Sequence, residues 1–195
     1  MKTSIATVSI SGDFEEKMAA IAAAGFDGIE IFENDFLAFD GSPRDAGQLV
    51  RDHGLEITLF QPFRDFEGMP EPQRARTFDR AERKFDLMGE LGADLVLICS
   101  NVSPLSLGDS FHTLARELDP NSIRSIPSDK IFFVQLADAP AIDMDLFHWS
   151  RHYRCMPGEG DLDVTRFMSA VAATGYDGYV SLEIFNDQFR GGSPK

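Results

Sequence analysis

Several residue types are scarce in this chain of 195 residues, and each scarcity argues against a class of protein. The two cysteines, Cys99 and Cys155, are too few for the disulfide framework of a small secreted domain and favour a reducing compartment. Lys and Arg number 18 against 32 Asp and Glu, giving a formal charge of −14, which opposes contact with a nucleic-acid backbone. No apolar run approaches membrane-spanning length. We therefore expect a cytoplasmic protein that binds neither nucleic acid nor a membrane.

The chain also lacks the Gly-x-Gly-x-x-Gly fingerprint of a dinucleotide-binding fold after its first apolar strand. It contains instead a regular alternation of short apolar strands and helices. Strands are predicted at residues 3–10, 28–32, 55–63, 93–100, 130–139 and 179–185, and helices at 13–25, 42–54, 72–92 and 161–175. This alternation predicts βαβ units and a parallel sheet.

Local signals fix the ends of these helices. Asp13 and Glu16 have the spacing of a capping box, and Gly25 is placed to end the same helix. Ser42 and Pro43 are typical of an N-cap followed by the first helical position. In the helix at 72–92, apolar residues at positions 78, 81, 85 and 88 are expected to share one buried face.

One phrase occurs twice, about 150 residues apart. "AAAGFDGIEIFENDF" begins at Ala22 and "AATGYDGYVSLEIFNDQF" begins at Ala172. Each copy runs from the end of a helix through a glycine turn into a strand that contains Glu-Ile-Phe. The echo predicts the same helix-turn-strand junction at the first and last steps of a repeated architecture.

The predicted strands favour a closed barrel over an open sheet, but they are too few. Six strands can be identified, whereas a TIM (β/α)8 barrel has eight and typically needs about 250 residues. No helix and no apolar strand separate the loop after residue 100 from Asp109. We therefore predict one α/β barrel domain over residues 1–195, with about two βα units missing at a seam between Gly108 and Asp109.

Polar residues cluster at the predicted carboxyl ends of strands, the face of a barrel where chemistry occurs. Asp109, Gln135 and Glu183 supply oxygen atoms, which Mg²⁺ and Mn²⁺ prefer as ligands. His112 follows Asp109 closely enough to act as a base beside a metal-bound substrate. Each residue alone has a structural explanation, because Glu183 could pair with an arginine and Gln135 could bind backbone amides. Three polar residues converging on one mouth favour a site, since burying them without partners is costly.

Three further polar residues lie at strand ends or in loops, and their roles are interpreted one by one. Glu30, in the first Glu-Ile-Phe, is interpreted as structural, fixing the first loops. Arg64 and Arg154 are candidates for holding an anionic substrate, because a guanidinium group matches a carboxylate. For Arg64 the alternative is an ion pair with Asp65 or Glu67.

A family resemblance is carried by seven stretches taken together: "SIATVSISGDFEEKMAAIAAAGFDGIEIFENDF", "FQPFRDFEG", "ICSNVSP", "DSFHTLAR", "FFVQLADAP", "HYRCMPGEGDLD" and "SLEIFNDQFR". With them the chain resembles the xylose-isomerase-like barrel superfamily of sugar isomerases, epimerases and endonuclease-IV-type enzymes. Within it the sequence is most similar to the bacterial 3-dehydroshikimate dehydratases, lyases that release water and yield protocatechuate. The resemblance covers nearly the whole chain.

The resemblance implies roles for residues in three groups. They are the metal ligands Asp109, Gln135 and Glu183, the catalytic base His112, and the substrate contacts Arg64, Asn101 and Arg154. It also implies a divalent cofactor (Mn²⁺, Mg²⁺ or Co²⁺), a small-molecule substrate, and a frequent fusion to a C-terminal dioxygenase-like domain. The ending "FRGGSPK" is interpreted as a cut from such a fusion, and self-association into a homo-oligomer stays open.

The chain departs from the family at one point. The family's fourth metal ligand is a glutamate on the fifth strand, and the predicted seam removes that strand together with the sixth. Two alternatives to a dehydratase therefore remain: a sugar or sugar-phosphate isomerase or epimerase on the same barrel, and a non-catalytic remnant that only binds a metabolite.

Overall fold

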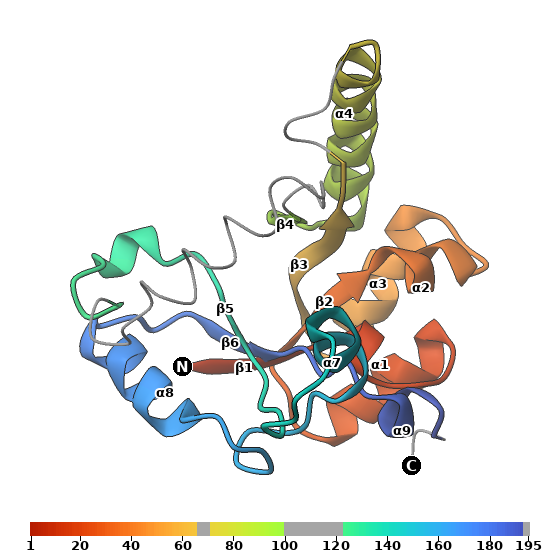
Figure 1. The fold of residues 1–195 in the computed structure, drawn as a ribbon. Helices are drawn as coiled ribbons and strands as arrows, with labels where there is room; N and C mark the ends of the chain where they lie inside the picture. Colours follow the sequence, from red (N-terminus) through yellow and green to blue (C-terminus); the bar gives the residue numbers. More distant parts are fainter. Residues whose placement is uncertain (66–70, 100–122, 193–195) are drawn as a thin grey trace.

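The computed structural model describes residues 1–65, 71–99 and 123–192 (Figure 1). The strands are β1 (Lys2–Ala6), β2 (Gly28–Phe32), β3 (Glu56–Phe63), β4 (Val96–Ile98), β5 (Val134–Leu136) and β6 (Tyr179–Leu182). The α-helices are α1 (Phe14–Ala23), α2 (Glu33–Ala38), α3 (Pro43–Asp52), α4 (Gln73–Leu91), α7 (Leu146–His152), α8 (Val164–Ala173) and α9 (Asp187–Arg190), with 3₁₀ turns at Thr7–Ser9 and Ser128–Lys130. The predicted seam at 108/109 lies outside the described residues, as do Asn101, Asp109 and His112.

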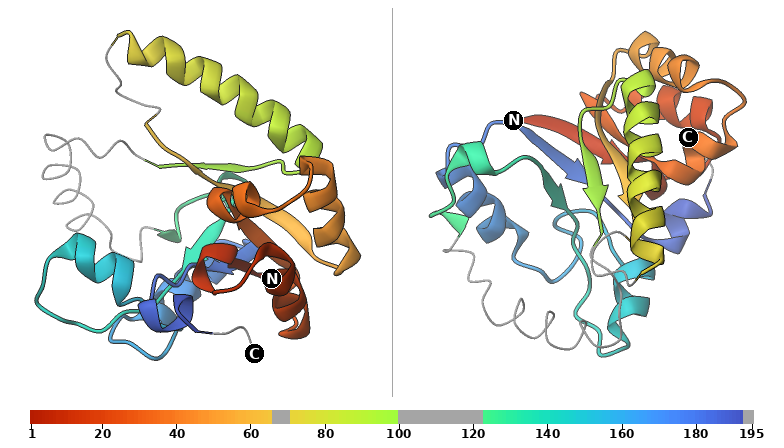
Figure 2. Two further views of the ribbon diagram at one scale, coloured as in Figure 1. Left: turned by 90° about the vertical axis from the view of Figure 1, so that its right-hand side faces the viewer. Right: turned by 90° about the horizontal axis from the view of Figure 1, so that it is seen from above.

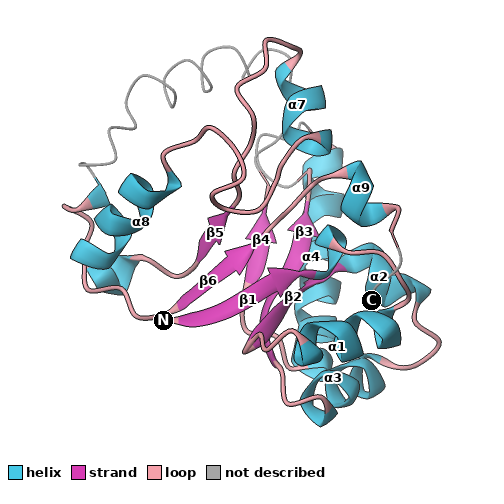
Figure 3. Cartoon of the chain, turned by 90° about the horizontal axis from the view of Figure 1, so that it is seen from below, coloured by secondary structure: helices cyan, strands magenta, loops and turns pink. Residues whose placement is uncertain are grey.

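The described strands form one parallel sheet in the order β4-β3-β2-β1-β6-β5. The six strands are those predicted from the sequence, although most are shorter than the apolar segments that indicated them. The sheet is curved (Figure 2), and all its strands point to one end, where α7 and α9 lie (Figure 3). The α/β class and the incomplete barrel are therefore confirmed. Within the described ranges, no helix combines the length and apolarity needed to cross a bilayer.

The predicted helix ends are confirmed in atomic detail. The Asp13 side chain accepts a hydrogen bond from the Glu16 amide at 2.8 Å, and Glu16 returns one to the Asp13 amide at 3.1 Å. Ser42 caps α3 in the same way, with Pro43 in its first turn. Gly25 and Gly175 have φ of 81° and 82°, a left-handed conformation that glycine adopts without strain. The two copies of the repeated phrase therefore make the same turn before β2 and β6.

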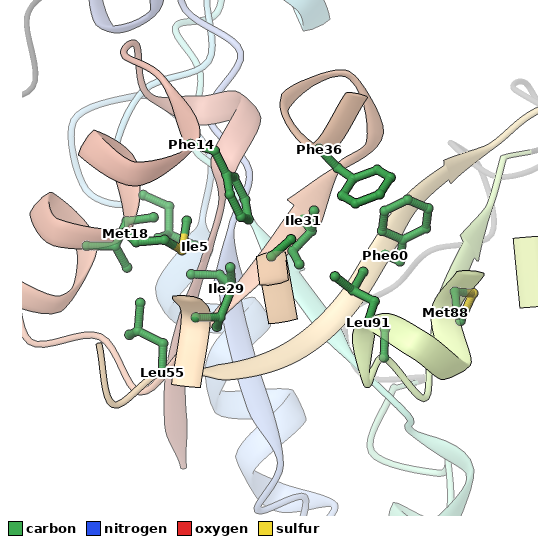
Figure 4. Close-up of a cluster of buried hydrophobic side chains, with 14 residues drawn as sticks. Ile5, Phe14, Met18, Ile29, Ile31, Phe36, Leu55, Phe60, Met88 and Leu91 are labelled. Carbon is green, nitrogen blue, oxygen red and sulfur yellow. The ribbon is translucent and has the colours of Figure 1, made fainter. Parts of the chain in front are cut away.

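Apolar residues of the strands pack outward against helices. The larger cluster lies between the sheet and α1 to α4 (Figure 4) and includes Ile5, Phe14, Met18, Ile29, Ile31, Phe60, Met88 and Leu91. A smaller cluster joins Val134 and Val180 to Val171 of α8. Because successive strand residues alternate between faces, the residues between these apolar ones point to the inside of the curve.

The buried face of α4 differs from the one predicted. Ala81 and Met88 are buried as expected, but Phe78 and Phe85 are 51% and 53% exposed. The buried stripe instead includes Leu91, because α4 turns this side toward the sheet. At about 100° per residue, Phe85 lies roughly 40° and Phe78 roughly 60° around the helix from Ala81, so both are at the margin of the buried stripe. The prediction of one shared apolar face was wrong for both phenylalanines.

The concave face of the sheet carries polar side chains, and these side chains lie close together. Its buried side chains include Ser4, Glu30, Thr58 and Ser181, where a typical barrel interior carries bulky aliphatic residues. The Tyr179 hydroxyl of β6 donates to Glu56 of β3, although β1 and β2 lie between these strands. The sheet must therefore curl strongly enough for side chains to meet across its hollow.

Candidate active site at the carboxyl ends of the strands

Glu30 of β2 is the centre of a buried polar cluster. It is completely buried, and its Oε2 accepts hydrogen bonds from the amide nitrogens of Gln61 at 2.8 Å and Gln135 at 2.6 Å. Gln61 belongs to the neighbouring strand β3, whereas Gln135 lies on β5 at the far edge of the sheet. The buried hydroxyl of Ser181 lies near the carboxyl group of Glu30, but neither it nor Oε1 completes a hydrogen bond of ordinary geometry within the described part of the chain. One carboxylate thus joins both halves of the curved sheet.

The bond between Glu30 and Gln135 crosses the hollow of the sheet. Strand β2 and strand β5 are separated by β1 and β6, so a flat sheet would hold them about 14 Å apart, three spacings of about 4.8 Å. Curvature shortens the distance enough for the two side chains to meet directly. The position where Gln135 lies is therefore fixed by the barrel-type fold and not by the local sequence around residue 135.

Burial changes the acidity of Glu30. Loss of solvent raises the pKa of its carboxyl group to about 8, and the negative charge of Glu183 acts in the same direction. The Ser181 hydroxyl and the Gln135 amide oppose this increase, because they stabilise the ionised form. The interpretation of Glu30 as structural stays a prediction: the contacts of its side chain in the described residues are with the side chains of Gln61 and Gln135.

The sequence contained a pattern that relates Glu30 to the candidate ligand Glu183. The same Glu-Ile-Phe phrase carries Glu30 on β2 and Glu183 directly after β6. Both carboxylates face the inside of the sheet, since Glu183 lies two positions after Ser181, which pairs with Gln135 across β5 and β6. Equal treatment of the two copies would have identified Glu30 as part of the site.

Glu183 is paired with Arg154, a contact that joins two of the predicted site residues. Arg154 Nη1 lies 2.7 Å from Glu183 Oε2 and also donates to the Glu183 carbonyl at 3.1 Å. The guanidinium group lies over the ring of Phe185 at 4.8 Å, and its Nε donates to the Ser150 carbonyl. The arginine is thus held in one orientation at the strand ends. The alternative that Glu183 pairs with an arginine is confirmed, and it places a cation beside the candidate ligand.

Arg64 lies near the same end of the sheet. It is exposed and makes no ion pair with any residue of the described ranges, so the alternative pairing with Asp65 finds no support there. Burial raises the pKa of the Cys99 thiol, the charge of Arg64 lowers it, and the charge of Glu183 raises it again. Arg64 and Glu183 therefore both act on Cys99 at the end of β4. The thiol stays protonated at neutral pH, which argues against a cysteine nucleophile.

The carboxylate of Asp138, the second residue after β5, is bound by backbone amides. Its carboxylate accepts hydrogen bonds from the amides of Ala139, Gly158 and Leu162, at 2.8, 2.9 and 3.0 Å. Burial acts to raise its pKa, but these amides outweigh burial and hold it below the usual value. Asp138 therefore folds the loop around residue 158 and is unsuited to act as a base.

The described donors fit a hard divalent cation. Gln135 uses its amide nitrogen on Glu30, which leaves its carbonyl oxygen for another partner, and Glu183 has a second carboxylate oxygen beyond the one that binds Arg154. Oxygen donors of this kind suit Mg²⁺ or Mn²⁺. The described ranges contain no group of three His, Cys, Asp or Glu residues arranged to hold a metal. The predicted set depends on Asp109, which lies outside these ranges.

Comparison with family models identifies the fold. The model of the xylose isomerase-like TIM barrel matches residues 18–108 and again residues 106–195. The chain belongs to the xylose isomerase-like TIM barrel family. The two matches meet where the sequence predicted the missing βα units. In this xylose isomerase-like chain, the candidate residues therefore come from both matched parts, Glu30 from the first and Gln135 and Glu183 from the second.

Two curated relatives share almost half of their aligned residues with this family member. The 3-dehydroshikimate dehydratases of Pseudomonas putida and Pseudomonas aeruginosa are each 48% identical over 246 aligned positions, which cover 97% of this chain and 39% of theirs. The alignment is longer than the chain, so the relatives contain residues with no counterpart here. The chain spans about two fifths of their length. An inosose isomerase of Bacillus velezensis is 24% identical and covers 74% of this chain and 45% of its own.

Solved structures show the same xylose isomerase-like architecture. A fusion protein of a xylose isomerase-like TIM barrel with a 4-hydroxyphenylpyruvate dioxygenase superposes with a TM-score of 0.89 at 48% identity, covering all of this chain and 40% of that protein. The IolI protein, solved with a bound zinc atom, superposes with a TM-score of 0.83 at 16% identity, covering all of this chain and 92% of IolI. The second likeness concerns the fold.

Proposed function

We propose that this chain is the barrel of a metal-dependent dehydratase that converts 3-dehydroshikimate to protocatechuate. The observation that carries the proposal is the 48% identity to two 3-dehydroshikimate dehydratases over 97% of the chain. The site supports it, because Gln135 and Glu183 lie on one polar inner face beside a fixed arginine. The weaker identity of 24% to an inosose isomerase favours dehydration over isomerisation.

Asp109, Gln135 and Glu183 would hold a divalent cation, which supplies Lewis-acid polarisation of the substrate ketone when bound. His112 removes the proton from the carbon next to that ketone. The neighbouring hydroxyl then leaves as water by taking up the proton held on His112, and tautomerisation of the resulting diene gives the aromatic ring. The protein's own task in this step is to place the base and to keep the substrate in one orientation.

Arg154 is suited to orient the substrate carboxylate. Its Nη1 and Nε are bound to Glu183 and the Ser150 carbonyl, so within the described part of the chain Nη2 is left for an anion. Arg64, exposed near the same strand ends, provides a second guanidinium group, and Asn101 is the third proposed substrate contact. One fixed guanidinium group and a second, exposed one beside a polar hollow match an anionic substrate of small size.

The proposal is tested by following the ultraviolet absorbance of the aromatic product with the chain, 3-dehydroshikimate and Mn²⁺, Mg²⁺ or Co²⁺. His112→Ala is expected to lower turnover roughly 10²-fold or more, because proton abstraction loses its base. The matched control is His53→Ala, since His53 caps α3 and bonds the Leu49 carbonyl through Nδ1. Absence of the aromatic product with every ion would refute the dehydratase. Unchanged turnover in His112→Ala would remove that residue from the mechanism.

A further inference from the structure

Glu30 has no role in the proton transfer described above, yet it is the most completely enclosed carboxylate of the polar cluster. Its exposed fraction is 0% and that of Gln61 is 3%. Both of its hydrogen-bond partners are primary amides, and both donate to the same oxygen, Oε2. Burying a carboxyl group costs free energy that hydrogen bonds only partly offset, so the question is which task an apolar residue at this position could not perform.

The task follows from the chemistry of the Gln135 amide. A glutamine side chain can present either an acceptor oxygen or a donor nitrogen to a ligand, and only a fixed partner decides between them. Both amides donate to the single oxygen Oε2 of Glu30, and this oxygen accepts whether the carboxyl group is ionised or carries its proton on Oε1. The Nε2 of Gln135 must therefore face Glu30, at 2.6 Å, and the carbonyl oxygen faces the other way. Glu30 thus determines which atom Gln135 offers.

We propose that Glu30 is a positioning residue that turns the carbonyl oxygen of Gln135 toward a divalent cation. The inference rests on the proposed function in one respect, namely that Gln135 is a metal ligand. A cation requires an oxygen at this position, and an inverted amide would present N–H groups that repel it. Partners that orient metal ligands typically contribute about 10- to 100-fold in metal affinity.

The local structure makes two substitutions informative. Glu30→Leu removes both acceptor oxygens at similar volume, so the Gln135 amide loses the contact that fixes it. Glu30→Gln keeps one oxygen that can accept from both amides, and its new amide nitrogen can donate to the nearby Ser181 hydroxyl. Glu30→Gln is therefore expected to restore most of what Glu30→Leu loses.

A matched control comes from the same inner face. Thr58 Oγ1 donates to the Ile29 carbonyl at 2.7 Å and lies 3.1 Å from Ser4 Oγ. Thr58→Val removes these buried polar contacts at constant volume without touching Gln135. If Glu30 only stabilised the interior, Thr58→Val and Glu30→Leu would act alike on metal affinity.

The experiment measures the dissociation constant of Mn²⁺ for the metal-free chain by titration calorimetry and by the electron paramagnetic resonance of free Mn²⁺. Circular dichroism and urea unfolding establish that each variant is folded, and Glu30→Met provides a second apolar substitution. We expect Glu30→Leu and Glu30→Met to weaken binding about 10- to 100-fold. Glu30→Gln and Thr58→Val are expected to stay within about threefold of the wild type.

Two results would overturn the inference alone. They are wild-type affinity in both apolar variants, and an equal loss of affinity in Thr58→Val. A wild-type chain that binds no Mn²⁺ would overturn the metal site of the proposed function, and the role of Glu30 with it. Because binding is measured without substrate, a chain that binds Mn²⁺ but forms no aromatic product would refute the dehydratase and leave the role of Glu30 to be judged by the variants.

Discussion

Glu30 and Asp138 are both buried acids near strand ends, but their surroundings give them opposite properties. Glu30 meets two side-chain amides and the charge of Glu183, and burial dominates, so its pKa rises to about 8. Asp138 meets three backbone amides, which hold its pKa below the ordinary value. The position of a carboxylate in the sequence therefore says less about its chemistry than the number and charge of its hydrogen-bond partners.

Asp138→Asn tests the second of these environments. The folded state lowers the Asp138 pKa, so the stability that it contributes is fully present above the unfolded pKa of about 4 and is lost as pH falls through the folded value. We expect the variant to lose about 1–3 kcal/mol of unfolding free energy at pH 7. Urea unfolding between pH 3 and 7 should show the difference from wild type shrinking below about pH 4.

The control for this measurement is Asp129→Asn. Asp129 is an exposed residue that forms an ion pair with the neighbouring Lys130, and exposed pairs contribute little. A gap between wild type and Asp138→Asn that stays constant down to pH 3 would contradict the electrostatic origin of the effect.

Individual residues were predictable from the sequence where their partners are near in the chain. Asp13 and Ser42 bond amides three residues away, so a short motif contains the whole interaction. Glu30 bonds Gln135, 105 positions away, and no local pattern contains that contact. The role of Glu183 was indicated by its strand end, but its pairing with Arg154 could be stated only as one alternative among several arginines.

Among the strands, β2 begins at a position, Gly28, where only a residue without a side chain fits. A Cβ on Gly28 would lie 2.7 Å from Thr58 Cγ2 and 2.8 Å from the Glu56 carbonyl oxygen. Both neighbours belong to β3, and the ring of Tyr179 closes the third side at 3.3 Å. The close spacing of the strands at this end leaves no volume for a side chain.

Gly28→Ala is therefore expected to destabilise the fold by about 1–3 kcal/mol, because overpacking forces the backbone of β3 to move. The comparison is Gly89→Ala inside α4, where the added Cβ meets nothing within 4 Å. That change should stabilise by roughly 0.5–1 kcal/mol, since alanine restricts the unfolded chain. Urea unfolding of the two variants should give effects of opposite sign, and equal signs would contradict the packing around Gly28.

Two substitutions in helix α4 test which of its faces is buried. Phe85→Gln should change the unfolding free energy by no more than about 0.5 kcal/mol, because the side chain is 53% exposed. Met88→Ala, at 5% exposure, should cost about 2–5 kcal/mol. Thermal or urea unfolding distinguishes this face from the one that the sequence predicted, for which both variants would be costly.

The error at α4 has a physical cause. Periodicity identifies apolar positions, but the covering element decides which of them are buried. Ala81 and Met88 meet the sheet, whereas Phe85 points away from it. The short helices α2, α7 and α9 were also not predicted, because four to seven residues carry too little periodicity to distinguish a helix from a loop.

For the whole molecule, the main feature is that the described residues supply six strands of a barrel type that has eight. Large apolar side chains are exposed on both sides of the predicted seam, Leu95 and Ile98 around β4 and Ile126 and Phe132 before β5. The two dehydratase relatives align over 246 positions, more than this chain contains. The intervening segment of such a relative is therefore the natural complement of these edges.

Insertion of that segment between Gly108 and Asp109 is expected to stabilise the fold and to raise Mn²⁺ affinity. The added strands would pair with the sheet edges and supply the family's glutamate ligand. The measurements are the urea midpoint, the fluorescence of a dye that binds exposed apolar surface, and Mn²⁺ calorimetry. A chimera with an unchanged midpoint and unchanged dye binding would contradict the interpretation of the seam.

The central position of β1 has a consequence for synthesis on the ribosome. Residues 2–5 pair with residues 179–182 of β6, so one side of β1 has no partner until β6, about 175 residues later in the chain, has been synthesised. At about 5–20 residues per second, that delay is roughly 10–35 s. During this time the nascent chain has β2 to pair with one side of β1, with β3 beyond it, while β6 is not yet available for the other side. Chaperone binding should therefore be strongest on nascent chains halted before residue 179 and should fall once β6 has left the exit tunnel.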